Sequence, residues 1–156
     1  MQVQQNISLK KFNSFGIDVS AAHFACFRNQ EELESLLTET GNRKSLLVLG
    51  GGSNILFTRN VDGWVLKNEI TGISRIAEDE TYYYIKAGAG ENWHGFVLHC
   101  IENGYAGVEN LALIPGSVGA SPMQNIGAYG VEIKDVFHSL EAFHIGDKTI
   151  ASVFQC

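Results

Sequence analysis

The sequence predicts a small α+β protein whose connecting loops are unusually rich in glycine. Its first half alternates strand, helix and strand, as a βαβ unit does, and its second half holds pairs of short apolar runs that indicate antiparallel hairpins. Glycine accounts for 17 of the 156 residues. That share is about 11%, against a usual 7%. Because most of these glycines fall in three places, they indicate local demands on the backbone and not a flexible chain.

The first half of the chain is predicted to hold the βαβ unit. A strand is expected over residues 22–27, and a helix from Gln30 to Thr40 follows it. Asn29 can cap this helix and Glu32 can reach back toward its start, in a capping-box pattern. Residues 45–49 are expected to be the parallel partner of the first strand. The buried stripe is predicted to consist of Leu33, Leu36 and Leu37, with Gly41 and Asn42 ending the helix.

The middle of the chain is predicted to hold a strand at residues 63–66 and an antiparallel pair at 73–77 and 81–87. A second helix is expected from about Asn92 to Asn103. Its inward face is predicted to consist of Phe96, Val97, Cys100 and Ile101.

The last part of the chain is predicted to form a further hairpin. A strand is expected from about Asp135 to His144, and a turn at Gly146 and Asp147 leads to a short strand over residues 148–151. Residues 152–156 then begin an element that does not continue. We therefore expect the chain to be part of a longer protein.

The composition is that of a globular, acidic chain. Hydrophobic residues make up 45% and charged residues 18%, which argues against intrinsic disorder and a coiled coil. Eleven Lys and Arg against 17 Asp and Glu give a net charge of −6, which disfavours nucleic-acid and anionic-membrane partners. No apolar run approaches the roughly 20 residues of a membrane span. We expect no nucleic-acid or membrane binding and no obligatory protein partner.

The cysteines and histidines show no pattern of a metal or disulfide site. Cys26, Cys100 and Cys156 are odd in number and include no Cys-x-x-Cys pair, which favours a reduced, cytoplasmic setting. His94 and His99 are five residues apart on a predicted helix and so do not share a face. No nucleophile motif and no acid/base pair can be assigned from spacing. The chemistry must therefore come from a cofactor, or from residues outside this sequence.

Three glycines and two small polar residues, from Gly50 to Asn54, follow the predicted strand at 45–49. Such a turn lets the backbone approach a ligand and point consecutive N–H groups at one anion, so it favours phosphate or diphosphate binding. The alternative is a tight turn that only needs positive φ angles. The motif is not a Rossmann fingerprint, because Ile55 stands where the third glycine would fall. It is not a P-loop either, since the sequence contains no Gly-Lys pair.

Two further glycine-rich segments follow. The first, Gly88 to Trp93, is by itself explained by a close turn before a helix and a core tryptophan. The second, Gly104 to Gly130, carries one charged residue, Glu109, and both prolines of the chain. Its glycines, apolar side chains and amides suit a large, flat, mostly neutral ligand such as a flavin. The alternative, an irregular loop packed on the protein itself, would leave many buried backbone groups to satisfy.

These segments carry a resemblance to a known family. Phe12 to Ile17, Leu49 to Asn54, Gly88 to Trp93 and Glu109 to Gly130 resemble, in order, the UDP-N-acetylenolpyruvoylglucosamine reductases (MurB). The resemblance implies the FAD-binding fold of the vanillyl-alcohol-oxidase and p-cresol-methylhydroxylase type, with C-terminal strands and a substrate domain missing. It implies two subdomains, over residues 1–70 and 71–156, with the flavin between them.

The resemblance also implies where FAD binds. Gly50, Gly51, Gly52, Ser53 and Asn54 would hold the diphosphate. The rest of the flavin would be lined by Pro115, Gly116, Ser117, Gly119, Asn125, Gly127 and Tyr129. Some related flavoenzymes attach FAD covalently through a His or Cys in the glycine loop. Because residues 50–54 contain neither, we expect noncovalent FAD.

The family reaction belongs to peptidoglycan synthesis in the cytoplasm. NADPH reduces FAD, and the flavin passes a hydride to the enolpyruvyl ether of UDP-N-acetylglucosamine enolpyruvate. The serine, arginine and glutamate that complete this reaction in the family have no counterpart among these residues, so we assign no catalytic residue and expect the chain alone to be inactive. The alternatives are another flavin oxidoreductase of the same fold and a non-catalytic nucleotide-binding module.

Overall fold

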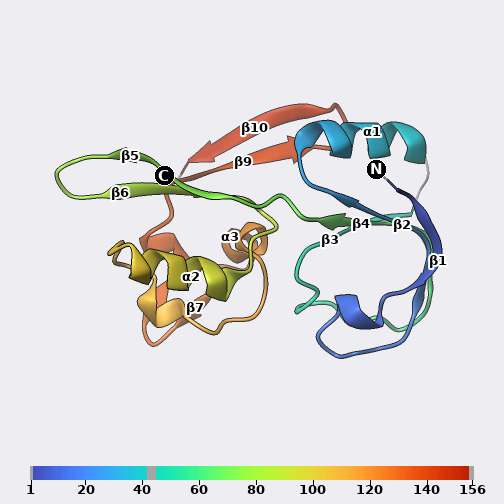
Figure 1. Ribbon diagram of the computed structural model, residues 1–156, viewed down its shortest axis with the longest axis horizontal. Coiled ribbons are helices and arrows are strands. Elements are labelled where there is room, and N and C mark those ends of the chain that lie inside the picture. Colours follow the sequence, from blue (N-terminus) through green and yellow to red (C-terminus); the bar gives the residue numbers. More distant parts are fainter. Residues whose placement is uncertain (1, 42–44, 155–156) are drawn as a thin grey trace.

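The structure is a computed structural model that describes residues 2–41 and 45–154. It has two lobes and two hairpins (Figure 1). The first lobe contains a four-stranded sheet and one helix, and the second contains a helix among irregular turns. The mixture of helices and of parallel and antiparallel strands confirms the predicted α+β class. Two residues that the predictions name, Asn42 at the expected helix end and Cys156, lie outside the described residues.

The first lobe is built on a sheet of strand order β1-β2-β4-β3. Its elements are β1 (Gln4–Ser8), β2 (Ser20–Phe27), α1 (Gln30–Thr40), β3 (Leu46–Leu49) and β4 (Val61–Asn68). Strand β4 lies between β2 and β3 and is parallel to both, whereas β1 is antiparallel to β2. The prediction that β3 pairs directly with β2 is therefore wrong. The apolar pattern defines a strand and its direction, but it does not show which neighbour lies between two parallel strands.

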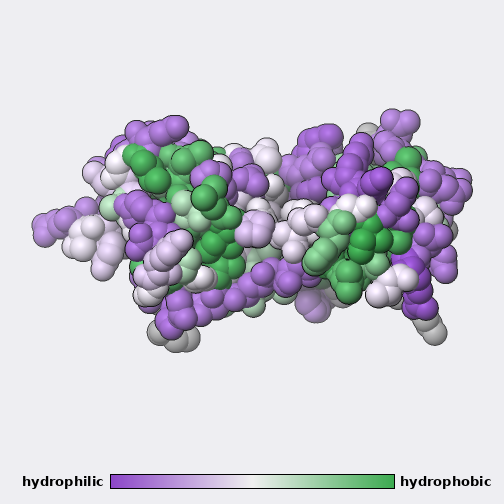
Figure 2. All heavy atoms as spheres, turned by 90° about the horizontal axis from the view of Figure 1, so that it is seen from below, coloured by the Kyte–Doolittle hydropathy of each residue, from purple (hydrophilic) through white to green (hydrophobic). Residues whose placement is uncertain are grey.

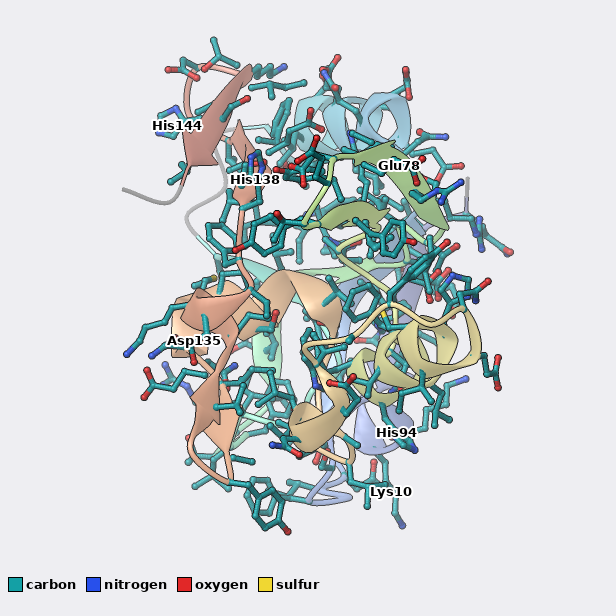
Figure 3. The ribbon with its side chains drawn as sticks, turned by 90° about the vertical axis from the view of Figure 1, so that its left-hand side faces the viewer. Lys10, Glu78, His94, Asp135, His138 and His144 are labelled. Carbon is teal, nitrogen blue, oxygen red and sulfur yellow. The ribbon has the colours of Figure 1, made fainter. Side chains whose placement is uncertain are left out.

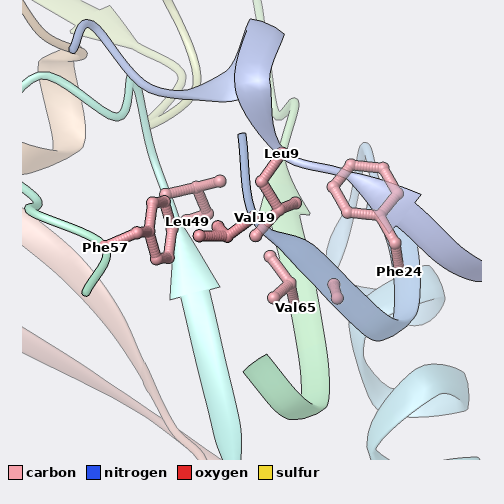
Figure 4. Packing of buried hydrophobic residues seen from close by; sticks show 7 residues of the cluster. Leu9, Val19, Phe24, Leu49, Phe57 and Val65 are labelled. Carbon is pink, nitrogen blue, oxygen red and sulfur yellow. The ribbon is translucent and has the colours of Figure 1, made fainter. Parts of the chain in front are cut away.

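Two hydrophobic clusters hold this lobe together. One lies on the face shown in Figure 4, where Leu9, Phe24 and Val65 pack with Leu49, the last residue of β3, and with Phe57 of the loop before β4. The other lies under α1, whose Leu33, Leu36 and Leu37 are buried as the sequence predicts. Both faces of the sheet are thus covered, which fixes the position of the loop that leaves β3.

Helix α1 begins at a side-chain cap. The Asn29 Oδ1 accepts a hydrogen bond from the Glu32 N–H at 2.8 Å. The Glu32 carboxylate reaches back one residue farther than a capping box does, because it accepts from the Arg28 N–H at 2.8 Å and not from that of Asn29. The predicted helix bounds are confirmed, and the reach-back partner is corrected.

Replacing Asn29 with alanine should lower the free energy of unfolding by about 1 kcal/mol, because it leaves N–H groups of the first helical turn without an acceptor. Urea denaturation followed by circular dichroism measures the change. Ser35→Ala, at an exposed position of the same helix, is the matched control and should change stability by less than about 0.5 kcal/mol. Equal effects at both positions would contradict the capping role.

The second lobe forms around α2 (Trp93–Glu102). Its core contains Trp93, Val97, Cys100 and Leu111. Ile101 was expected to face inward, but it is 47% exposed, because the apolar stripe of α2 is narrower than its hydrophobic sequence suggests. The lobe also contains α3 (Ser121–Gln124) and the short pair β7 (Gly127–Ala128) and β8 (Val131–Glu132).

Two antiparallel hairpins lie beside each other above the lobes in Figure 1. They are β5 (Ile73–Glu78) with β6 (Tyr83–Ala87), and β9 (Ser139–His144) with β10 (Thr149–Phe154). Lys86 of β6 pairs with Glu141 of β9 at 2.8 Å. The strand expected from Asp135 is wrong at its start, since residues 133–135 form a 3-10 turn with a capping box. None of the helices described is long and apolar enough to cross a membrane.

Candidate functional site

The glycine turn that follows β3 lies directly against Gly116 and Ser117, some 65 residues later in the chain. A Cβ built on Gly51 would lie 3.1 Å from the Gly116 Cα, and a Cβ on Gly50 would lie 2.8 Å from the Ser117 Oγ. Both approaches are closer than a side chain permits without movement. Two predicted site segments therefore meet backbone to backbone, and glycine is what allows the approach.

The third glycine segment, Gly88 to Trp93, contacts the residues that follow Ser117. The Gly119 N–H donates to the Ala89 carbonyl at 3.0 Å, and the Val118 N–H donates to the Glu91 carbonyl at 2.9 Å. A Cβ on Gly119 would lie 2.6 Å from the Cβ of Ala89. Gly88 to Trp93, which alone indicates only a tight turn, thus supports the segment that faces the turn after β3.

Hydrogen bonds also connect the Gly88–Trp93 segment to residues 70–72, the linker between the two lobes. The Glu91 carboxylate accepts a hydrogen bond from the Gly72 N–H at 2.6 Å. The Gly90 N–H donates to the Ile70 carbonyl at 2.7 Å. A Cβ on Gly90 would clash with that same linker, lying 2.8 Å from the Ile70 nitrogen. The three glycine segments therefore form one stack of backbone where the two lobes meet.

Several hydrogen-bond donors in this stack have no acceptor among the residues that the structure describes. The N–H groups of residues 51–54 donate to none of them, and neither do those of Gly116 and Ser117. The hydroxyls of Ser53 and Ser117 likewise make no hydrogen bond to described residues, and the Ser53 Oγ would lie 3.2 Å from a Cβ on Gly116. A set of unpaired N–H and O–H donors around a glycine turn fits an anion such as a diphosphate.

A turn near the N-terminus holds the middle of the glycine turn in place. The Ser14 N–H donates to the Gly52 carbonyl at 3.0 Å. Gly52 has a φ of +72°, and a Cβ there would lie 2.0 Å from the Phe12 carbonyl oxygen. Site prediction from the sequence overlooked this contact. Its signal was Asn13 followed at the third position by Gly16, a pattern typical of a tight turn.

The other predicted flavin residues lie farther along the second lobe. Asn125 has a left-handed backbone and donates through its Nδ2 to the Glu132 carboxylate at 3.1 Å. Gly127 belongs to β7, and Tyr129 forms the turn that follows it and is 90% exposed. An open hollow of about 530 Å³ is lined by Asn125, Gly127, Ala128, Gly130, Val131, Glu132, Lys134 and Asp135. Val118 of the glycine stack packs on the same hydrophobic cluster as Ala128 and Val131, which line this hollow. The role of these residues in binding the flavin stays a prediction.

Apolar side chains are exposed near both parts of the candidate site. Leu113 is 77% exposed, Met123 88% and Leu56 64%. On the face seen in Figure 2, hydrophobic atoms gather over both lobes, with paler atoms between them. Exposed apolar side chains beside a few polar groups suit a flat aromatic ring with a phosphate chain.

Titratable side chains do not gather into a catalytic cluster in the part of the chain that the structure describes. In Figure 3, His144 lies at the opposite end of the view from Lys10 and His94. The His94 ring accepts a hydrogen bond from the Leu113 N–H at 3.3 Å through Nδ1, a structural role. His144 instead faces Asp147, with 2.8 Å between Nδ1 and Oδ1. No group of three potential metal ligands lies together among the described residues.

Cys100 is a core residue of α2, as the sequence predicts, and is 2% exposed. Burial, followed by the charge of Glu109, raises the pKa of its thiol to about 11. Burial and Glu69 do the same for Cys26, whose pKa is also about 11.

The raised pKa of Cys100 makes stability depend on pH above neutrality. The folded chain keeps the thiol proton while the unfolded chain loses it near pH 9, so the free energy of unfolding should fall as pH rises from about 9 to about 11. Denaturant titrations across that range should show a shallower fall for Cys100→Ala than for the unchanged chain. Identical slopes would contradict the shift.

The glycine stack and the lobes around it define a class of nucleotide-binding flavoprotein domain. The chain matches the FAD binding domain family over residues 21–151 and belongs to it. FAD is the cofactor of that family, so the predicted cofactor is confirmed, whereas the predicted FAD-binding residues stay predictions.

Curated relatives name a particular member of this class. The chain is 51% identical over 146 residues to the UDP-N-acetylenolpyruvoylglucosamine reductase of Amoebophilus asiaticus, covering 93% of this chain and 43% of that one. It is 54% identical over 143 residues to the enzyme of the same name from Pseudomonas savastanoi pv. phaseolicola, covering 91% and 42%. The chain thus spans less than half the length of these relatives.

A solved structure supports the fold. The crystal structure of UDP-N-acetylenolpyruvylglucosamine reductase (MurB) from Thermus caldophilus matches with a TM-score of 0.76. The match covers 99% of this chain and 53% of that one at 24% sequence identity. The predicted FAD-binding fold and the resemblance that led to it are therefore confirmed.

Proposed function

We propose that this chain is the FAD-binding part of a UDP-N-acetylenolpyruvoylglucosamine reductase, an enzyme of peptidoglycan synthesis. The observation that carries the proposal is the stack of three glycine segments, in which the N–H groups of residues 51–54, Gly116 and Ser117 find no acceptor among the described residues. The sequence identity of the chain to relatives of that name supports this reductase over other flavoproteins. The proposed substrate is UDP-N-acetylglucosamine enolpyruvate, and the proposed reductant is NADPH.

In this proposal, the chain's own residues bind and orient the cofactor. Residues 50–54 hold the diphosphate through backbone N–H groups and the Ser53 hydroxyl. Pro115, Gly116, Ser117 and Gly119 bind the flavin beyond it. Asn125, Gly127 and Tyr129 complete the lining of the flavin site. When bound, FAD supplies hydride transfer between NADPH and the enolpyruvyl double bond.

Binding by backbone donors explains how an acidic chain can hold a diphosphate. With a net charge of −6, the protein does not attract anions through its overall field. Local N–H groups can still stabilise a negative charge, because each carries a partial positive charge and the fold holds it in a fixed direction. The attachment is proposed to be noncovalent, since residues 50–54 include neither His nor Cys.

Two subdomains, residues 1–70 and 71–156, are proposed to enclose the flavin. The separate cores of the two lobes support this division, and Ile70 packs against the core of the first lobe. The hairpin of β9 and β10 is shared, because Phe143 also packs on that core. A cytoplasmic location is part of the same proposal, on the ground of a cysteine content without a paired motif.

Titration of the 156-residue chain with FAD, followed by flavin fluorescence and visible absorbance, tests the cofactor proposal. We expect stoichiometric binding, and we expect ultrafiltration after denaturation to release all the flavin. A chain that stays folded but binds no FAD would contradict the proposal. Covalent attachment would contradict its noncovalent form.

A second assay tests the activity. NADPH oxidation dependent on UDP-N-acetylglucosamine enolpyruvate should be absent in this chain, because it is proposed to supply the cofactor site without the catalytic side chains. Appreciable turnover by the chain alone would overturn that part of the proposal.

A further inference from the structure

Asn13 is a buried polar residue whose side chain bonds to the backbone of its own turn. It is 7% exposed, and its side chain uses all its polar atoms within one turn of the backbone. The Nδ2 group donates to the Leu9 carbonyl at 2.8 Å and to the Ile17 carbonyl at 3.0 Å. The Oδ1 accepts from the Ile17 N–H at 3.0 Å. One side chain thus joins both ends of the turn from Leu9 to Ile17.

This turn is fixed to the core on one side. Leu9 is fully buried, and its N–H donates to the Val19 carbonyl at 2.7 Å. The ring of Phe12 stacks on that of Phe24, with 4.7 Å between their centroids. Figure 4 shows Leu9 and Phe24 in the same cluster as Leu49, the last residue of β3. The turn and the strand that precedes the glycines therefore share one core.

On its other side the turn meets the middle of the glycine turn. The Ser14 N–H donates to the Gly52 carbonyl at 3.0 Å. The space where a Cβ of Gly52 would lie is bounded by the Phe12 carbonyl oxygen, at 2.0 Å, and by the Asn13 Cα, at 3.0 Å. Any opening of the turn at Asn13 would move the two groups that hold Gly52 in its left-handed conformation.

We propose that Asn13 is a positioning residue for the cofactor's diphosphate: it closes the turn that holds Gly52, and so aims the N–H groups of residues 51–54. It touches no ligand itself. The inference rests on the proposed FAD function. It adds a residue, in a separate segment of the chain, on which the affinity for the diphosphate depends.

Asn13→Ala tests this role, with Asn60→Ala as the matched control. The Asn60 Oδ1 also accepts from a backbone N–H of the first lobe, that of Ser20 at 3.0 Å, but Asn60 is exposed and this bond goes to the start of β2 and not to the turn that holds Gly52. Dissociation constants are measured for FAD and for ADP, which carries the same diphosphate without the flavin. The visible spectrum of the protein-bound flavin at saturating FAD is recorded for each variant.

For Asn13→Ala we expect at least tenfold weaker binding of both FAD and ADP, with an unchanged bound-flavin spectrum at saturation. Asn60→Ala should stay within twofold of the unchanged chain. A folded Asn13→Ala chain that binds ADP normally would overturn the inference. A changed flavin spectrum would also overturn it, because it would show general structural loss and not a displaced diphosphate turn.

Gly16→Ala decides the question if Asn13→Ala does not fold. Gly16 has a φ of +64° with no heavy atom within 4 Å of a built Cβ, so alanine strains the turn without a clash. We expect threefold to tenfold weaker ADP and FAD binding, and unchanged ADP binding would overturn the inference. Failure of the unchanged chain to bind FAD would instead overturn the proposed function, so the two failures are distinguishable.

Discussion

Replacing Gly52 with alanine should abolish tight FAD binding, whereas the same replacement at Gly104 should leave it nearly intact. Both glycines have a φ of +72°, so both substitutions carry the same backbone strain, of about 1–2 kcal/mol. Only at Gly52 does the new Cβ collide with fixed backbone, 2.0 Å from the Phe12 carbonyl oxygen. At Gly104 no heavy atom lies within 4 Å.

The collision at Gly52 cannot be relieved by turning a side chain. The Phe12 carbonyl belongs to a turn fixed by Leu9 and Asn13, so the glycine turn itself must move away. A displaced turn no longer aims its N–H groups at one point, and we expect FAD affinity to fall at least a hundredfold, or about 2.7 kcal/mol. Fluorescence titration of both variants measures the difference. Binding by Gly52→Ala within threefold of Gly104→Ala would contradict the proposed diphosphate site.

Local elements of this fold could be predicted from the sequence where the hydrophobic pattern is strong. Helix α1 begins and ends where its cap and its leucines place it. Strand β1 was not predicted, because Gln4, Gln5 and Asn6 are polar and the strand lies at an exposed edge of the sheet. The pairing of β3 with β4 could not be predicted either, since strand order depends on tertiary packing.

The candidate site was partly predictable for a similar reason. Glycines in a turn show that the backbone must approach something, but they do not show what. At Gly51 and Gly119 the approach is to other parts of the chain, which makes the glycines necessary even without a ligand. The left-handed backbone of Leu113 and Tyr129 has no signal in the sequence, because neither residue type favours that conformation.

These two uses of glycine are connected. Close packing of Gly51 on Gly116 brings the turn after β3 and the segment before α3 together, and the N–H groups of residues 51–54 keep no acceptor among the described residues. The tight-turn interpretation and the phosphate interpretation of residues 50–54 are therefore compatible: the internal contacts fix the backbone in the form that can bind an anion.

Replacing Trp93 with alanine should remove a large part of the stability of the second lobe. The side chain is 2% exposed, and its Nε1–H donates to the Leu111 carbonyl at 2.7 Å. Large-to-small replacement of a buried aromatic residue costs about 3–5 kcal/mol. That is a substantial share of the roughly 5–15 kcal/mol that holds a domain folded. Leu98→Ala, on the exposed side of the same helix, should cost less than about 1 kcal/mol.

Substitutions at Trp93 should lower the stability of the chain more than its FAD affinity, because Trp93 supports the site indirectly. Its backbone N–H donates to the Gly116 carbonyl at 3.1 Å, and no side-chain substitution removes that bond. Trp93→Phe keeps most of the buried ring but leaves the Leu111 carbonyl without its donor, at a cost of about 1–3 kcal/mol. We expect this variant to unfold at lower denaturant concentration, yet to bind FAD within fivefold of the unchanged chain. Equal stability of Trp93→Phe and the unchanged chain would show that the indole hydrogen bond does not anchor the loop that carries Leu111.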